Sequence, residues 1–174
     1  DPPFELEEGF VFLANDEGMG EFTVPVGDAA TWSIQGHTIK CSGRPRGYLK
    51  TNKSYRNFTL RLDFRYERPK KLKDDDKFKG NTGYMMYISD ENTPWPACVE
   101  VQGKHVQLAK IVAIGGAEAV ETQDDEQARV ENRKPAGQWN RLEIHSKEGA
   151  LVSILNGVKI AESKPGRLTE GHVT

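Results

Sequence analysis

The stretch FTLRLDFRY, residues 58–66, carries the clearest structural pattern of this chain. Apolar and polar side chains alternate along it with a period of two, which is the period of a β-strand. One face of this strand holds five apolar or aromatic side chains, and the other is polar and densely charged. The stretch therefore predicts a strand whose first face lies on a core.

Short strand patterns separated by turn signals continue on both sides of this stretch. Gln35-Gly36 separates two apolar runs near the start of the chain, and Asn156-Gly157 supplies two positive-φ positions for a type I′ turn between residues 151–155 and 158–161. Residues 117–134 are the stretch with helix-forming composition. We therefore expect an all-β fold, a two-sheet antiparallel β-sandwich with one short helix near residues 117–134.

The length and charge of the chain bound its class. At 174 residues it fits one domain with a core of its own, so we expect a single domain over residues 1–174. The net charge of −2 provides no basic field that would attract nucleic acid. No apolar run approaches the roughly 18 residues that span a bilayer, so no membrane span is expected.

Cysteine and acidic residues give no metal-binding pattern. Cys41 and Cys98 either pair in an oxidising compartment or are small buried hydrophobic residues. The chain has no CxxC motif and no Cys/His cluster with zinc-ligand spacing. The run Asp74-Asp75-Asp76 lacks the spaced ligands and the glycine of a calcium loop. We expect neither a metal nor a cofactor.

The stretch GNTGYMMYISDENTPWPACVEVQ, residues 80–102, concentrates the side chains that could bind a ligand. It reads as one strand that runs through residues 84–88, a proline-rich turn at residues 90–96 and a second strand at residues 98–102. Glu100 and Gln102 share one face of the second strand, and Trp95 precedes that strand. An acid, an amide and an aromatic ring together suggest a polyhydroxyl ligand such as a sugar, although the same three side chains also occur on ordinary sheets.

The order and spacing of several motifs resemble the 3-keto-disaccharide hydrolase domain family, also called DUF1080. They are GFVFLAN at residues 9–15, W(x)IQGHTI at 32–39, NTG at 81–83, EVQ at 100–102 and LNG at 155–157. The resemblance implies a jelly roll of the concanavalin A-like type and a carbohydrate partner. It also implies an extracellular or periplasmic protein, which the absence of an initiator Met favours. Similar domains continue into one more strand, so we expect residues 1–174 to lack the C-terminal strand.

The resemblance further implies sugar chemistry on the concave face of the jelly roll, where the polar sides of the two strands would meet. Asp63, Arg65, Glu100 and Gln102 would then share one neighbourhood. The alternative is a solvated sheet that carries cross-strand ion pairs such as Arg65 to Glu100.

Two mechanisms fit these residues. In ordinary glycoside hydrolysis, Glu100 and Asp63 would flank the scissile bond. In an elimination beside a keto group, Glu100 would be the base and His105 the acid, while Arg65 or Lys110 would stabilise the enolate oxygen. Substrate contacts would come from side chains of both strands and their loops, namely Gln102, Arg65, Trp95, Asn81 and Lys110.

Two other functions remain open. A non-catalytic, lectin-like carbohydrate-binding module would use the same jelly roll, since fold does not dictate function. A structural interaction domain would expose an apolar patch instead of a polar groove. The enzyme differs from the binding module in having a second titratable group within reach of Glu100.

Overall fold

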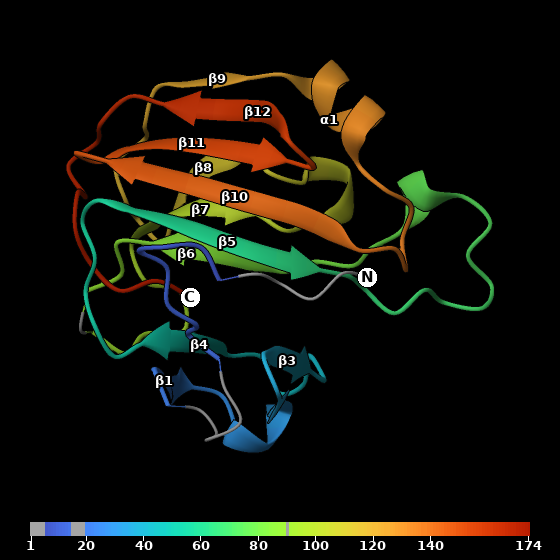
Figure 1. The fold of residues 1–174 in the computed structure, drawn as a ribbon, viewed down its shortest axis with the longest axis horizontal. Helices are drawn as coiled ribbons and strands as arrows, with labels where there is room; N and C mark the ends of the chain where they lie inside the picture. The colour runs from blue at the N-terminus through green and yellow to red at the C-terminus, as the bar shows by residue number, and fades with distance from the viewer. Residues whose placement is uncertain (1–5, 15–19, 90) are drawn as a thin grey trace. The chain divides into compact units, whose positions relative to one another are not determined.

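The computed structural model describes residues 6–14, 20–89 and 91–174 (Figure 1). The chain divides into two compact units, which we describe separately. Unit 1 contains residues 1–53 and 92–94, and unit 2 contains residues 54–91 and 95–174. The expectation of a single domain stays a prediction.

Unit 1 consists of two antiparallel strand pairs. Strand β1 (Phe22–Val26) pairs with β4 (Tyr48–Thr51), and β2 (Trp32–Gln35) pairs with β3 (Thr38–Cys41). The turn between β2 and β3 contains Gly36 at φ 57°, so the predicted hairpin is confirmed. Residues 6–13 form no strand although their sequence is apolar.

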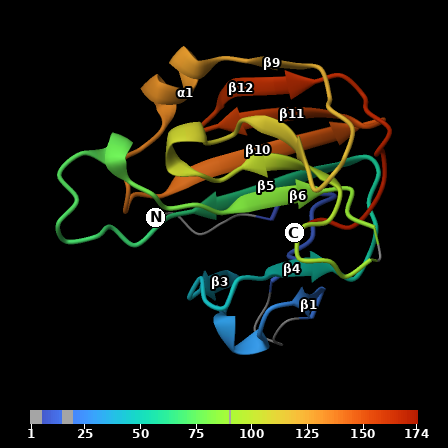
Figure 2. The same ribbon diagram turned by 180° about the vertical axis from the view of Figure 1, so that it is seen from behind.

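Unit 2 contains two antiparallel sheets. The first has five strands in the order β5 (Phe58–Phe64), β10 (Asn140–Lys147), β11 (Ala150–Leu155), β12 (Val158–Ser163) and β9 (Thr122–Asp124). The second has three strands, β6 (Gly83–Met86), β7 (Cys98–Gln102) and β8 (Ile111–Ile114). Seen from behind, β6 and its neighbours lie in front of the five-stranded sheet (Figure 2).

The two sheets of unit 2 enclose one hydrophobic core. Both supply completely or almost completely buried side chains, among them Leu142, Ile144 and Leu151 from the first sheet and Val99, Val101 and Ile111 from the second. Burial of this much apolar surface is the main force that holds such a sandwich together. The predicted β-sandwich is confirmed.

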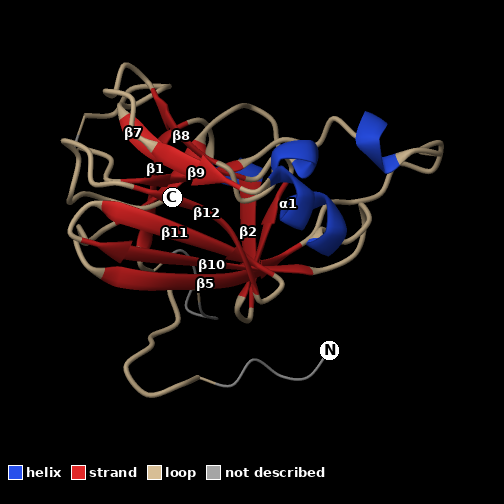
Figure 3. Cartoon of the chain, turned by 90° about the horizontal axis from the view of Figure 1, so that it is seen from above, coloured by secondary structure: helices blue, strands red, loops and turns tan. Residues whose placement is uncertain are grey.

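The helical expectation is confirmed over a shorter span. Helix α1 (Glu126–Asn132) lies beside β12 (Figure 3), and Asp125 caps it by accepting a hydrogen bond from the Ala128 amide at 2.8 Å. The described part of the chain also contains three one-turn 3₁₀ helices, at Ala29–Thr31, Asp75–Lys77 and His105–Gln107. Residues 122–124, which the composition assigned to the helix, form strand β9 instead.

Residues 172–174 pair with β6 and with the residues just after it. Ile88 and His172 exchange backbone hydrogen bonds of 3.0 and 2.8 Å, and the Thr174 amide donates to the Met85 carbonyl at 3.0 Å. Strand β6 ends at Met86 because Tyr87 has φ 65°, which interrupts the extended backbone. The β6 edge opposite β7 is therefore covered, from Met85 to Ile88, by the end of the chain.

Both cysteines are free thiols, with Cys41 exposed and Cys98 buried. The described residues contain no helix long and apolar enough to cross a membrane. Within the same ranges, no group of three or more His, Cys, Asp or Glu side chains could hold a metal ion.

Candidate functional site

Glu100 is a buried carboxylic acid in the middle of β7. Its neighbours Val99 and Val101 face the core, so Glu100 points to the opposite face of the three-stranded sheet. Met85 on β6 and Val112 on β8 lie directly across from it. The Glu100 side chain is only 9% exposed and has apolar neighbours on both adjacent strands.

Gly83 provides the space that this carboxyl group occupies. A Cβ atom at residue 83 would lie 1.7 Å from Glu100 Oε1 and 2.5 Å from Cδ. Any side chain there would displace the acid, since real Cβ atoms do not approach other atoms so closely. A glycine inside a strand often marks such a close approach.

Gln102 holds the other oxygen of the acid. Its Nε2 donates to Glu100 Oε2 at 2.8 Å, and its Oε1 accepts a hydrogen bond from the Lys104 amide at 3.3 Å. The backbone contact fixes which end of the amide faces Glu100. Gln102 is therefore a positioned donor to the carboxylate.

Burial raises the pKa of Glu100 to about 7. The cause of this rise is the loss of hydration on burial, which disfavours the charged form of the carboxyl group. Burial and the charge of Glu100 also raise the pKa of the Cys98 thiol, which stays protonated. An acid with this pKa exchanges protons near neutral pH, which is the property required of a general base or acid.

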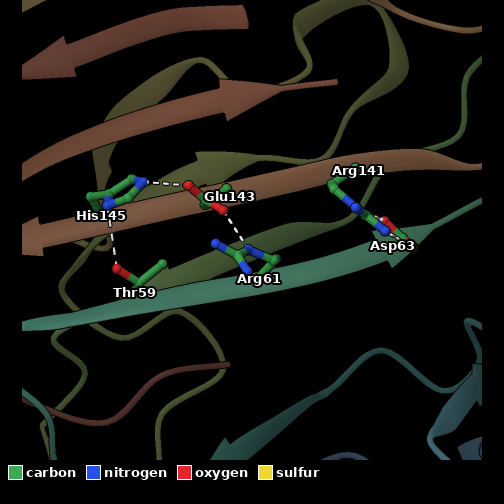
Figure 4. Close-up of polar contacts among 6 residues, drawn as sticks. All are labelled: Thr59, Arg61, Asp63, Arg141, Glu143 and His145. Atoms are coloured by element: carbon green, nitrogen blue, oxygen red, sulfur yellow. Dashed lines mark hydrogen bonds and ion pairs between the residues drawn. The ribbon is translucent and has the colours of Figure 1, made fainter. Parts of the chain in front are cut away.

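The structure corrects the predicted position of Asp63. Asp63 lies on the face of β5 turned away from the core and forms a double hydrogen bond with Arg141, of 2.8 and 3.0 Å (Figure 4). It belongs to the five-stranded sheet, whereas Glu100 belongs to the three-stranded sheet. The shared neighbourhood of Asp63 and Glu100 is therefore wrong, because the polar faces of two sheets that enclose one core point in opposite directions.

Arg65 belongs to the same distant face. Its guanidinium carbon lies 5.0 Å from the centre of the Trp139 ring, a cation–π contact. The predicted pairing of Arg65 with Glu100 does not occur. Arg65 is consequently no candidate for stabilising an oxygen near Glu100.

A polar network that the sequence did not suggest as a site occupies that face of the five-stranded sheet. Glu143 forms an ion pair with Arg61, and His145 Nε2 lies 2.5 Å from Glu143 Oε1 (Figure 4). Thr59 Oγ1 is 3.3 Å from the other ring nitrogen of His145. Burial alone would raise the pKa of Glu143, but the hydrogen bonds from Arg61 and His145 outweigh it and lower the pKa. Pairing of β5 with β10 brings these residues together, so the network reads as cross-strand stabilisation.

His105 lies beneath the connection between β5 and β6. Its side chain is 1% exposed, its ring meets the edge of Phe78 at a centroid distance of 5.5 Å, and its Nε2 has no hydrogen-bond partner among the described residues. Burial is the largest cause that lowers the pKa of His105, followed by the charge of Arg133. The ring is neutral at pH 7, which does not favour the predicted role of acid.

The remaining predicted side chains have separate positions. Lys110 Nζ lies 4.0 Å from Asp124 Oδ2, and the charge of Lys110 does not contribute to the pKa of Glu100. Trp95 is 64% exposed in the loop before β7, where a sugar ring could stack on it. Asn81 is exposed and lines a hollow next to the start of β6.

Two solved structures resemble this chain. The carbohydrate-binding module CBM66 from Bacillus subtilis matches with a TM-score of 0.57 and 15% identity, over 88% of this chain and 84% of that one. A candidate glycosyl hydrolase from Parabacteroides distasonis matches with a TM-score of 0.60 and 16% identity, over 93% and 83%. At these identities the likeness shows the β-sandwich fold alone.

A comparison with curated proteins gives no match. Residues 9–173 match the model of a family described as the 3-keto-alpha-glucoside-1,2-lyase-like domain. The match spans nearly the whole chain, including Gly83 and Glu100. This protein therefore belongs to the 3-keto-alpha-glucoside-1,2-lyase-like domain family.

Proposed function

We propose that this protein cleaves a glycosidic bond beside a 3-keto group, with Glu100 as the proton-transferring residue. The observation that carries the proposal is the buried Glu100 carboxyl, whose pKa is about 7 and whose two oxygens are placed by Gly83 and Gln102. The family supports a carbohydrate substrate.

A single carboxyl group suits elimination better than hydrolysis by two carboxylates. A carbonyl at C3 of a sugar acidifies the proton on C2, and Glu100 would remove that proton. The electron pair of the broken C–H bond forms a double bond between C2 and C1, and the bond from C1 to the glycosidic oxygen breaks. The leaving oxygen then takes a proton, which the protonated Glu100 can supply because its pKa is close to neutral. Water adds to the double bond afterwards.

Hydrolysis by two carboxylates would need a second acid near Glu100, and the predicted one is not there. Paired acids in glycosidases lie within about 10 Å of each other on either side of the bond. Asp63, the predicted partner, lies on the outer face of the other sheet, where it is bound to Arg141. Elimination needs no such partner.

The second candidate function is a non-catalytic carbohydrate-binding module. It is favoured by the lack, among the described residues, of a second charged group that acts on Glu100. The likeness in fold to CBM66 is compatible with it. In this case Glu100 and Gln102 would bind sugar hydroxyls, and no bond would break. Export to the periplasm or the medium stays a prediction in either case.

The test compares 3-keto and unoxidised forms of the same disaccharides, with Glu100→Gln as the variant and Asp63→Asn as its matched control. We expect monosaccharide to be released from the 3-keto form alone, by the wild type and by Asp63→Asn. Unchanged turnover by Glu100→Gln would refute the role of Glu100. Binding of both sugars without cleavage of either would establish the binding module instead.

A further inference from the structure

A hollow of about 640 Å³ lies beyond the paired ends of β6 and β7. Its lining comes from the end of the β5–β6 connection and from the residues that follow β7, and it includes Lys77, Phe78, Lys79, Asn81, Lys104 and Val106. Three ammonium groups and an amide thus surround two apolar side chains. None of these residues except Asn81 was predicted to bind a ligand.

The hollow has an excess of positive charge. Neither Lys79 nor Lys104 has an acidic partner within 4 Å among the residues that the structure describes, and Lys77 has a loose, exposed contact of 3.7 Å with Asp74. Asp76 also lines the hollow, but Arg133 binds it in an ion pair. The charge of the one carboxylate in the lining is therefore neutralised, and the lysine side chains are available to bind an anion.

The hollow adjoins the Glu100 site along the same two strands. Asn81 lies two residues before Gly83, and Lys104 lies two residues after Gln102. The Gln102 side chain accepts a hydrogen bond from the Lys104 backbone amide. At about 3.3 Å per residue, the Cα atom of Lys104 lies at most roughly 13 Å from that of Glu100. A ligand of more than one sugar ring can span such a separation.

We propose that this hollow binds the anionic group of an acidic saccharide whose neighbouring ring lies at Glu100. The inference rests on the proposed function and adds the class of substrate to it. The ammonium groups of Lys79 and Lys104 would pair with a carboxylate or a phosphate, and the Asn81 amide would donate to a hydroxyl. Phe78 and Val106 would contact the apolar face of the ring.

The test measures binding by titration calorimetry with two pairs of disaccharides that differ only in charge. Trehalose 6-phosphate is compared with trehalose, and cellobiouronic acid with cellobiose. We expect the anionic member of at least one pair to bind about tenfold more tightly or better, and this advantage to shrink with added salt. The pair that shows the advantage identifies the anion as phosphate or carboxylate.

The double variant Lys79→Gln, Lys104→Gln should lose the advantage, so that it binds the charged and neutral members of each pair with equal affinity. Lys164→Gln, an exposed lysine of the same unit, is the matched control and should keep it. Equal affinity of the wild type for charged and neutral members would overturn this inference and leave the proposed function standing. A failure to bind any of these sugars or to act on the 3-keto disaccharides would overturn both.

Discussion

The carboxyl group of Glu100 occupies the space that a side chain at Gly83 would fill, since a Cβ atom there would lie 1.7 Å from Oε1. The two residues lie on adjacent strands, and the glycine pairs with Gln102, two residue pairs along the ladder from the pair of Met85 and Glu100. The position of the acid thus depends on the absence of a side chain on the neighbouring strand.

Gly83→Ala should reduce turnover of a 3-keto disaccharide by roughly 10²-fold or more, the usual contribution of a positioned base. The new methyl group would force the carboxyl away while the strand stays intact, since alanine is compatible with an extended backbone. Gly166→Ala is the control, because its Cβ would meet only the end of the Val120 side chain, at 2.7 Å. Equal turnover of the two variants would contradict the dependence on Gly83.

The rate should depend on pH through Glu100. Because a base must be ionised and burial raises the pKa of Glu100 to about 7, kcat/KM should rise with pH and level off above that value. The measurement is a pH–rate profile on a 3-keto disaccharide. A profile that is flat around neutrality, or that has its midpoint near the ordinary value for glutamic acid, would rule out this assignment.

Glu100 should also make folding stability depend on pH. Its pKa is higher in the folded than in the unfolded protein, so the folded state binds more protons between the two pKa values and loses stability as the pH rises through that window. The full cost of ionising the buried acid above pH 7 is on the order of 3 kcal/mol. Glu100→Gln should therefore unfold at higher denaturant concentration than the wild type above neutral pH, with little difference at acidic pH. The opposite order would show that the acid is stabilised by ionisation.

Gln102→Leu should raise the pKa of Glu100 further. The variant keeps a similar volume but removes the Nε2 donor that lies 2.8 Å from Oε2 and favours the ionised form. Since a hydrogen bond to a charged group contributes about 1.5–3 kcal/mol, the midpoint of the pH–rate profile should move upward by roughly one to two pH units. A lower rate with an unmoved midpoint would mean that Gln102 contacts the substrate only.

Asp63→Asn should leave both turnover and binding of a 3-keto disaccharide unchanged. The Asp63 carboxylate forms a partly exposed ion pair with Arg141 within the five-stranded sheet, whereas Glu100 belongs to the three-stranded sheet. Such pairs contribute at most about 1 kcal/mol to stability. Chemical denaturation with parallel activity assays measures both quantities. A large loss of turnover with unchanged stability would return Asp63 to the active site.

The sequence predicted strands better than it predicted which strands are neighbours. Alternation in residues 58–66 and 98–102 correctly assigned the polar face of each strand, because alternation is a local property. It does not tell which sheet a strand joins. Asp63 lies beside Arg141, which is 78 residues away in the sequence, and only this long-range pairing places Asp63 far from the Glu100 face.

Local exceptions account for the other differences. The strand expected to reach Ile88 ends two residues earlier, because Tyr87 adopts φ 65°, a conformation that no sequence pattern at a tyrosine indicates. The position of Glu100 did leave a signal, since Gly83 interrupts an otherwise bulky strand. The sequence contains no sign of the burial that raises the pKa of Glu100, because a strand of the same composition is equally compatible with a solvated acid.

The pairing of residues 172–174 with Met85 and Ile88 has a consequence for how the protein folds. Strand β6 acquires its second neighbour only when a segment far along the sequence has docked, and Gly171 must also find Tyr55 across most of the chain. Contacts of such long range form slowly and leave a strand edge open in the meantime. A partly folded molecule in which residues 172–174 have not yet docked should therefore associate with its own copies through this open edge more readily than the native protein does.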